Sequence, residues 1–401
     1  MNAPLVKPGL LREIARYGAV DISACFNCGN CSAVCPLSEG SESFPRRAIR
    51  LGQLGRAEEL LASDVPWLCH HCGECTQTCP RQADPGEYMA AVRRWTIARL
   101  EPTGIGKLML QGVVGPILVT LGIAMMLGLF LLRIKVGAEE GLEAGFDSWP
   151  FRALVAYGTI HAVGIAVGLL LTMSLAISLF RFVKPRRARL LQKDPATRTG
   201  MLAALRSTLV DVATMRRQRS ESSPKGLGWL RNPWFIHILI LGGFAGLLLA
   251  TIFDLVVLYL LKDTLHLTVF WPARVLGTGA GFALLAGVVL AIVRRVRRDG
   301  PSAATTRAAD AWLLVLLLLL AVTGFWIEIA VTFAIQAPVN DWILLVHSVM
   351  AMELVLLTGA TKLFHAVGRP LALLFMHMRR DPAVEVALRP GCSTEKAASI
   401  H

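Results

Sequence analysis

The feature that most limits how this chain can fold is a series of six apolar runs separated by charged segments. Each run reaches the roughly 20 residues that an α-helix needs to cross about 30 Å of hydrocarbon. Backbone polar groups inside lipid must bond to one another, so the runs predict transmembrane helices. A mean hydropathy of +0.54 and a charged content of 17% agree with this interpretation. The expected spans are residues 108–132, 152–183, 235–261, 271–293, 311–335 and 342–366.

The segments between the runs alternate in charge. Residues 133–150 are net acidic, and 336–341 carry no base, whereas 184–231 and 294–307 are rich in arginine. Basic loops remain in the cytoplasm, which predicts a multi-pass protein of the bacterial inner membrane with both termini cytoplasmic. The first twenty residues carry Glu13 and lack the apolar core of a signal peptide, and they predict a short amphipathic helix.

The formal charge of +13 lies in these loops and not on one soluble face, which argues against nucleic acid as a partner. The long basic loop contains "TGMLAALRSTLVDVATMRR", an amphipathic stretch. It predicts a helix that lies on the membrane surface or against a soluble partner.

Eight of the nine cysteines stand in two near-copies. The first cysteine run, Cys25–Pro36, reads "CFNCGNCSAVCP", and the second cysteine run, Cys69–Pro80, reads "CHHCGECTQTCP". Both follow C-x2-C-x2-C-x3-C-P, the spacing typical of [4Fe–4S] ligands. The alternatives are a zinc site, which pairs two C-x2-C elements across a spacer, and a disulfide staple, which a reducing cytoplasm disfavours.

In two-cluster ferredoxins the fourth cysteine of each run binds the cluster of the other run. The same crossing is expected here. Gly29 and Gly73 suit the tight loops around the clusters, and the segment between the runs has a helical pattern. His70 and His71 are expected to be loop residues that bias the reduction potential or meet a partner, and Cys392 an ordinary thiol. The predicted ligands are Cys25, Cys28, Cys31 and Cys79 for cluster 1, and Cys69, Cys72, Cys75 and Cys35 for cluster 2.

Four histidines predict two b-type haems in the membrane. His161 lies toward the outer face and His237 toward the cytoplasmic face, while His347 and His365 lie near opposite ends of the last span. The eighteen residues between the last two make about five helical turns, which places both on one side of a helix about 27 Å apart. Depth then pairs His161 with His347 and His237 with His365, as bis-histidine haem ligands. The alternative is four interfacial histidines that hydrogen-bond to neighbours or lipid headgroups.

Small and charged residues in the spans extend this hypothesis. Quinone chemistry beside a haem needs a proton relay, which intramembrane charged groups can supply, although such groups also serve as helix-to-helix hydrogen bonds. His266 and His377 are left out of the ligand set. The candidate quinone and proton residues are Glu353, Lys362, Glu328 and Asp254. The glycines expected to leave room for porphyrin, or to serve plain helix packing, are Gly158, Gly164, Gly168, Gly242, Gly243, Gly246 and Gly359.

The two runs with their helical linker resemble the heterodisulfide reductase C family of dicluster ferredoxins. The membrane half resembles the dihaem cytochromes b of the nitrate reductase gamma and heterodisulfide reductase E type. In nitrate reductase gamma proteins the other two ligands share one helix, whereas here His161 and His237 come from different spans. The fusion in this order, through "CPRQADPGEYMAAVRRWTIARLEPTGIG", is similar to the membrane component of quinone-interacting membrane-bound oxidoreductase (Qmo) complexes.

The resemblance implies a membrane protein that works with soluble flavin and iron–sulfur subunits. Such complexes pass electrons between quinone and adenylylsulfate reductase. The sequence holds no Gly-rich dinucleotide loop, so flavin chemistry is expected on another chain. Two alternatives stay open: the membrane arm of a heterodisulfide reductase, and a haem-free anchor whose ferredoxin head docks a soluble enzyme.

The expected fold is therefore mainly α: an N-terminal α-helical dicluster ferredoxin followed by a six-helix transmembrane cytochrome b bundle. The expected divisions are a cytoplasmic ferredoxin domain at 1–107, a membrane domain at 108–378 and a polar tail at 379–401.

Overall fold

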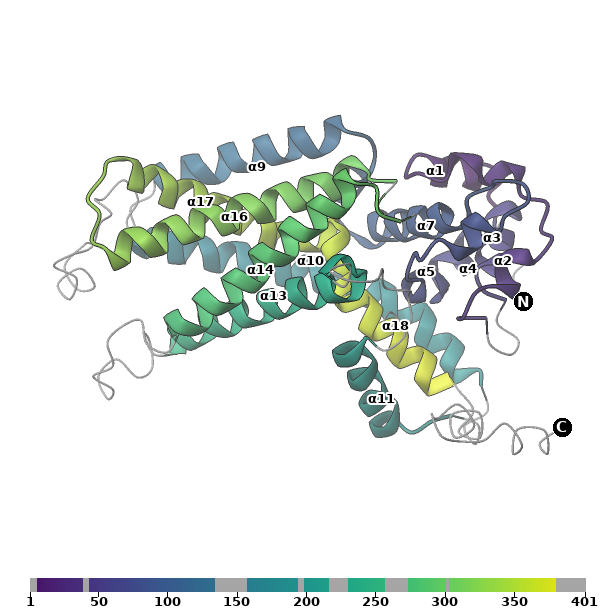
Figure 1. The fold of residues 1–401 in the computed structure, drawn as a ribbon. Helices are drawn as coiled ribbons and strands as arrows, with labels where there is room; N and C mark the ends of the chain where they lie inside the picture. The colour runs from purple at the N-terminus through teal and green to yellow at the C-terminus, as the bar shows by residue number, and fades with distance from the viewer. Residues whose placement is uncertain are drawn as a thin grey trace. The chain divides into compact units, whose positions relative to one another are not determined.

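The computed structural model confirms the expected fold class. It describes residues 6–38, 43–133, 157–193, 198–215, 230–256, 273–300, 303 and 305–379. This part of the chain consists of helices joined by turns and contains no strand. Six of its helices are long and apolar enough to cross a membrane (Figure 1).

The chain forms two compact units. The first comprises Met1–Gln111, Met173–Ser220 and Gly359–His401, and the second comprises Gly112–Thr172 and Glu221–Thr358. The ferredoxin part therefore packs with later segments of the chain.

The N-terminal part of the first unit is built from short helices around α7 (Pro85–Leu100). Asp84 caps α7 by accepting a hydrogen bond from the Glu87 backbone N–H at 3.0 Å, and Pro85 suits the first turn because its missing N–H has no helical partner there. Tyr88 and Trp95 of α7 are at most 1% exposed and form the core. The shorter elements are α1 (Leu10–Ala15), η1 (Val20–Ala24), α2 (Asn30–Ala33), α3 (Arg46–Gln53), α4 (Ala57–Leu61), α5 (Val65–Leu68), α6 (Glu74–Gln77) and α8 (Ile105–Leu110). The helical linker between the cysteine runs is thus confirmed.

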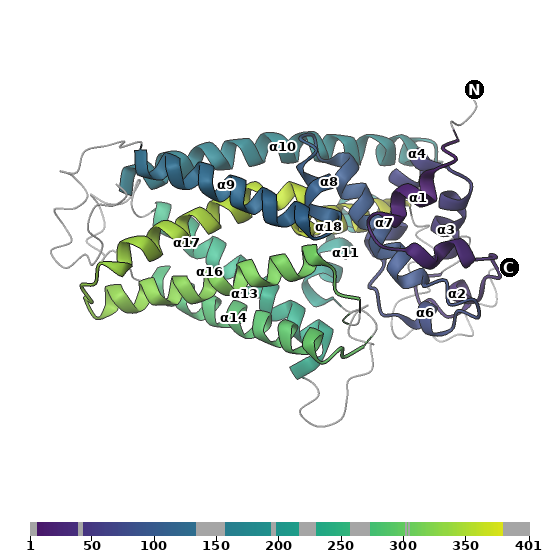
Figure 2. The ribbon, with the colours of Figure 1, turned by 90° about the horizontal axis from the view of Figure 1, so that it is seen from above.

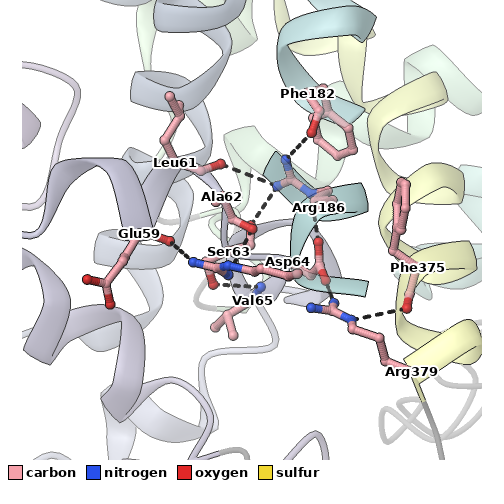
Figure 3. Close-up of polar contacts among 11 residues, drawn as sticks. Glu59, Leu61, Ala62, Ser63, Asp64, Val65, Phe182, Arg186, Phe375 and Arg379 are labelled. Atoms are coloured by element: carbon pink, nitrogen blue, oxygen red, sulfur yellow. Dashed lines mark hydrogen bonds and ion pairs between the residues drawn. The ribbon is translucent and has the colours of Figure 1, made fainter. Parts of the chain in front are cut away.

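Two longer helices complete the first unit. The part of α10 (Tyr157–Leu191) from Met173 onward belongs to it, as does α18 (His365–Arg379). Figure 3 shows the buried contact that joins them to the segment before α5. The Asp64 carboxylate accepts a hydrogen bond from Arg186 Nε at 2.7 Å and also pairs with Arg379. Because Arg186 and Asp64 are 0% and 5% exposed, this ion pair is shielded from water.

The amphipathic stretch of the basic loop forms α11 (Met201–Thr214), as predicted. One side of α11 contacts α18, where His377 and Asp211 lie 3.1 Å apart. Leu202 and Leu209 remain 82% and 60% exposed. The helix therefore has one face packed on protein and one exposed apolar face.

The second unit holds the remaining long helices. Their bounds are α9 (Val114–Arg133), the first part of α10, α13 (Pro233–Val256), α14 (Ala273–Val296), α16 (Ala308–Thr332) and α17 (Val339–Leu356). Helices α13 and α14 run side by side (Figures 1 and 2). A cluster of buried residues, with Leu127 on α9, Val167 on α10 and Val349 on α17, ties these three helices together.

The last apolar run differs from the prediction. It is not one helix from 342 to 366: α17 ends at Leu356, two short helices follow, and α18 begins at His365. Thr361 has an extended backbone (φ −121°, ψ −177°), which no α-helix contains, and its hydroxyl accepts a hydrogen bond from the Leu363 N–H. The inference that His347 and His365 share one helical face is therefore wrong.

Candidate electron-transfer site

The two cysteine runs adopt the same backbone. Asn27 and His71 occupy equivalent places with φ of 65° and 60°, and Gly29 and Gly73 follow with φ of 92° and 91°. Each glycine precedes a single helical turn, α2 or α6, and these two turns are in contact. Positive φ is accessible to glycine at little cost, which explains its place in both loops.

The first set of predicted ligands shares one electrostatic environment. Burial is the largest cause that raises the pKa of the Cys31 thiol, and the negative charges of Cys25, Cys28 and Cys79 raise it further. Three of these residues belong to the first run, while Cys79 closes the second. Cys79 therefore lies near enough to Cys31 to affect its pKa, while the crossed ligand set stays a prediction.

The second set has the reciprocal arrangement. The pKa of Cys35 is raised to about 11, mainly by burial and in addition by the charges of Cys69 and Cys72. The pKa of Cys75 is raised by burial and then by the charges of Cys69, Cys72 and Cys35. Cys35 of the first run thus lies with the second run, as the crossed arrangement requires.

A cavity lies at the second set and tests whether an iron–sulfur cluster fits there. All four residues of the set, Cys35, Cys69, Cys72 and Cys75, line it, together with His70 and His71. Among the described residues, no three His, Cys, Asp or Glu side chains are arranged to hold a single metal ion. Four thiols that line one hollow suit a cluster that carries its own sulfide.

Positive charge and N–H groups surround the second set. The Arg93 guanidinium donates to the backbone oxygens of Pro66 at 2.8 Å and Cys69 at 2.6 Å. The His71 N–H lies 3.4 Å from Cys69 Sγ. The pKa of His71 is lowered to about 4, mainly by burial and in addition by nearby cations, including Arg93 and Lys362. His71 is therefore neutral at pH 7, and the fixed cations are arginine and lysine.

The first set faces a different environment. The Cys28 side chain is exposed, and the neighbouring Phe26 is 60% exposed with Arg81 6.0 Å from its ring centre. The Gln53 amide donates to the Cys25 carbonyl oxygen at 2.8 Å. An edge of this set is therefore open to solvent.

His347 is held in a form that can bind a metal. The Thr323 hydroxyl donates to the Leu319 carbonyl oxygen at 2.7 Å, so its oxygen accepts from His347 Nδ1 at 2.8 Å. This fixes the proton on Nδ1 and leaves the Nε2 lone pair for ligation, the usual arrangement of metal-binding histidines. Gly324 lies close to the ring, because a Cβ there would stand 3.2 Å from His347 Cε1.

His365 has the same tautomer. Its Nδ1 donates to the Lys362 backbone oxygen at 2.5 Å, and a carbonyl can only accept. The lone pair of the ring is therefore on Nε2. The chemistry of both histidines fits axial haem ligation.

The other two predicted haem ligands, His161 and His237, lie in α10 and α13. His161 lies near the start of α10, between Ile160 and Val163, which pack in the same buried cluster as the α17 residues beside His347. His237 lies in α13 of the second unit and His365 in the first unit, and their pairing stays a prediction.

Several of the glycines serve helix packing. A Cβ at Gly243 would lie 2.7 Å from Leu284, and one at Gly246 would lie 2.6 Å from the Ala280 Cβ, so these two let α13 approach α14 closely. Nothing lies within 4 Å of a Cβ at Gly168 or Gly242, while Gly164 and Gly359 have ordinary contacts. The surroundings of Gly158 lie outside the described part of the chain.

Among the candidate proton residues, Glu353 has the most unusual position. It is 1% exposed in α17, and the Thr120 hydroxyl of α9 hydrogen-bonds to it. Trp312 Nε1 of α16 in turn donates to Thr120 Oγ1 at 2.6 Å. Glu353 Oε1 has no hydrogen-bond partner among the described residues. Glu353, Thr120 and Trp312 thus form a series of hydrogen bonds that connects α17, α9 and α16, with Glu353 at its end.

The remaining candidates have other surroundings. Glu328 accepts a hydrogen bond from Arg274 Nε at 2.5 Å, which makes it half of an ion pair between α16 and α14. Lys362 lies in η7 (Lys362–Phe364) of the first unit, near His71. Asp254 lies in α13, and its side chain is outside the described residues, as are His266 and Cys392.

The structure adds residues that the spacing of motifs did not indicate. Thr323 and Gly324 contact His347, and Arg93 and Arg369 lie beside the second cysteine run. Thr and Gly in an apolar helix, and Arg in an amphipathic one, are too common to be recognised without their neighbours.

Comparison with known proteins agrees with the cysteine geometry. A family model described as a 4Fe-4S dicluster domain matches residues 21–83, which include both runs. The chain is 36% identical over 101 residues to a protein of Archaeoglobus profundus described as similar to the C component of heterodisulfide reductase, a match that covers 25% of this chain and 52% of the relative. This chain thus spans about half the length of that curated relative. No solved structure matches the chain.

These observations identify a domain for two [4Fe–4S] clusters in a chain with six helices that could span a membrane. Together they fit an electron-transfer subunit of a membrane oxidoreductase with several subunits.

Proposed function

We propose that this chain carries electrons between the quinone pool and a cytoplasmic flavin and iron–sulfur partner of dissimilatory sulfur metabolism. The path uses two b haems in the membrane helices and the two [4Fe–4S] clusters. The observation that supports it most is the cavity ringed by Cys35, Cys69, Cys72 and Cys75 in a chain that also has six apolar helices. By resemblance, the partners are flavin and iron–sulfur subunits and adenylylsulfate reductase.

The clusters, when bound, store and release single electrons. Cys25, Cys28, Cys31 and Cys79 hold cluster 1, and Cys69, Cys72, Cys75 and Cys35 hold cluster 2. Arg93 places positive charge beside Cys69 and orients the loop through two carbonyl oxygens. Net charge, N–H contacts and exposure set the reduction potential of such centres, so the two sets should differ in potential.

The haems would supply one-electron steps across the membrane. His347 and His365 present Nε2 as ligating atoms, since Thr323 and the Lys362 carbonyl hold each Nδ1 proton. His161 and His237 complete the two bis-histidine pairs.

Quinone oxidation or reduction moves protons as well as electrons. Glu353 is the residue to which we assign this task, because a buried carboxyl with one oxygen left unbonded can accept and release a proton. Thr120 and Trp312 hold the other part of the carboxyl in place. Glu353→Gln should abolish quinone turnover while both haem spectra persist. Glu328 is half of an ion pair with Arg274, so Glu328→Gln should retain quinone turnover.

Purification of the intact complex tests the proposal. Iron, acid-labile sulfide and haem are quantified, and reduced-minus-oxidised optical spectra are recorded with EPR. We expect two clusters and two b haems per chain, with one haem lost in His347→Ala and one in His365→Ala. A complex that contains clusters but no haem would overturn the quinone-to-cluster path and favour the anchor with a docking ferredoxin head.

The Archaeoglobus relative favours a second candidate, the membrane arm of a heterodisulfide reductase. This alternative predicts the same cofactors but different companions. A copurifying thiol–disulfide subunit would support it, and copurifying flavoproteins that interact with adenylylsulfate reductase would support the first proposal.

A further inference from the structure

The second cysteine run is joined to α18 by a direct polar contact. Arg369 Nη2 donates to His70 Nδ1 at 2.6 Å, and His70 lines the cavity of the second cysteine set. Since Nδ1 accepts this bond, the ring proton of neutral His70 is on Nε2. Arg369 lies four residues after His365, so the two share one side of α18. About one helical turn thus separates His365, the proposed haem ligand, from Arg369, which hydrogen-bonds to the cavity residue His70.

Close aromatic packing reinforces this contact. Trp67, two residues before Cys69, packs its ring 5.6 Å from that of Phe364, which directly precedes His365. Phe182 of α10 completes the group, 5.2 Å from Trp67. A Cβ at Gly368 would stand only 2.6 Å from Trp67, so α18 and α5 are in backbone-to-ring contact. No room for water or a movable side chain lies between them at this point.

The first set offers the opposite situation. The exposed Cys28 and the 60% exposed Phe26 place an edge of that set at the surface of the first unit. The two sets are also neighbours, because α2, which contains Cys31, is in contact with α6, which contains Cys75. An order of three adjacent centres follows from these contacts.

We propose that cluster 2 is the relay that exchanges electrons with the centre at His365, and that cluster 1 is the terminal relay that exchanges them with the soluble partner at Cys28. This inference rests on the proposed function. Each step moves one electron: the donor centre is oxidised as the acceptor centre is reduced, and no proton or covalent bond changes partners. Electron transfer through protein slows steeply as the gap widens, so packed contacts decide the order.

Arg369 and His70 act as positioning residues for cluster 2. The guanidinium holds the imidazole against the cavity, and its positive charge favours the reduced, more negative form of that cluster. Arg46 is the matched residue for cluster 1, because its Nη1 lies 3.5 Å from the Cβ position of Gly29.

The order is tested with the full complex in inverted membrane vesicles. Haem and cluster content are first measured, and vesicles without haem would refute the proposed function before the order is tested. A membrane-impermeant viologen radical then supplies electrons to the cytoplasmic side, and samples frozen at increasing times are analysed by optical and EPR spectroscopy. In Cys72→Ser we expect normal reduction of cluster 1 and loss of the haem-reduction phase.

Cys28→Ser should slow haem reduction less than Cys72→Ser, because cluster 2 keeps its contact with α18. If Cys28→Ser loses the haem phase and Cys72→Ser keeps it, the order is reversed. Equal loss in both variants would also overturn the proposal.

Redox titrations give a second readout that does not depend on these ligand variants folding normally. Arg369→Gln should lower the midpoint potential of cluster 2 alone, Arg369→Lys should restore part of it, and Arg46→Gln should lower that of cluster 1 alone. A shift of cluster 1 in Arg369→Gln would contradict the placement of cluster 2 at α18.

Discussion

The two cysteine runs have the same spacing and the same loop backbone, but they differ in packing and in exposure to solvent. The second is enclosed by α18, Arg93 and buried aromatic rings, whereas the first has an exposed cysteine and an exposed phenylalanine. Ligand geometry is therefore a local property that can be copied along a chain. The role of each centre depends on what packs around it, and the following experiments separate the two contributions.

Loss of a ligand should have the largest effect. Cys28→Ser and Cys79→Ser should remove the same EPR signal, and Cys72→Ser and Cys35→Ser the other, each with about half of the non-haem iron. Cys392→Ser, outside both runs, is the control and should keep all of it. If Cys35→Ser removes the same signal as Cys28→Ser, the ligands are not crossed.

The second largest effect is expected from removal of the buried Asp64 charge, which lies five residues before the second cysteine run. Asp64→Asn leaves the Arg186 and Arg379 guanidinium groups without their carboxylate. Breaking a buried pair of this kind costs about 3–5 kcal/mol. The melting temperature of the detergent-solubilised protein, followed by tryptophan fluorescence, should fall accordingly.

The matched control is Asp299→Asn. Asp299 pairs with Arg231 at 3.4 Å with both side chains partly exposed, and such pairs contribute about 0–1 kcal/mol. Similar losses for the two variants would show that the Asp64 contact is not shielded as described.

A methyl group between α18 and α5 should have an intermediate effect. Gly368→Ala places a Cβ 2.6 Å from the Trp67 ring, which is 1% exposed and cannot move aside. Overpacking of this kind costs about 1–3 kcal/mol. We expect a lower melting temperature and faster loss of cluster 2 than of cluster 1 to a chelator.

Gly279→Ala provides the control in another helix. Nothing lies within 4 Å of a Cβ there, so alanine should be neutral or slightly stabilising. If Gly368→Ala and Gly279→Ala have the same melting temperature and the same rate of cluster 2 loss, close packing of α18 on α5 does not stabilise the second run.

The smallest expected effect comes from alanine at the glycine of each cysteine run, and it should be the same in both runs. Gly29 and Gly73 have φ of 92° and 91°, and a side chain in this region costs about 1–2 kcal/mol wherever it occurs. Gly29→Ala and Gly73→Ala should therefore lower the melting temperature by similar amounts. A much larger loss at Gly73 would show that packing, and not loop strain, dominates there.

Sequence patterns predicted the local features well and the long-range ones poorly. The two cysteine runs, the helical linker and six apolar helices were all recognisable because each signal lies within a few turns of chain. The break between Leu356 and His365 was missed because the stretch is largely apolar, and hydropathy alone does not distinguish a helix from a short irregular segment. Gly243 and Gly246 could be read as room for porphyrin until Leu284 and Ala280 were seen against them.

The sequence by itself determined which thiols can bind iron and which segments can cross lipid, since spacing fixes loop geometry and apolar length fixes membrane span. Only the tertiary structure decided which cysteine set lies against α18 and which lies at the surface. That decision depends on contacts such as Arg369 with His70, which are 299 positions apart in the chain. Short-range patterns carry no information about such a contact, because it forms only when distant helices pack.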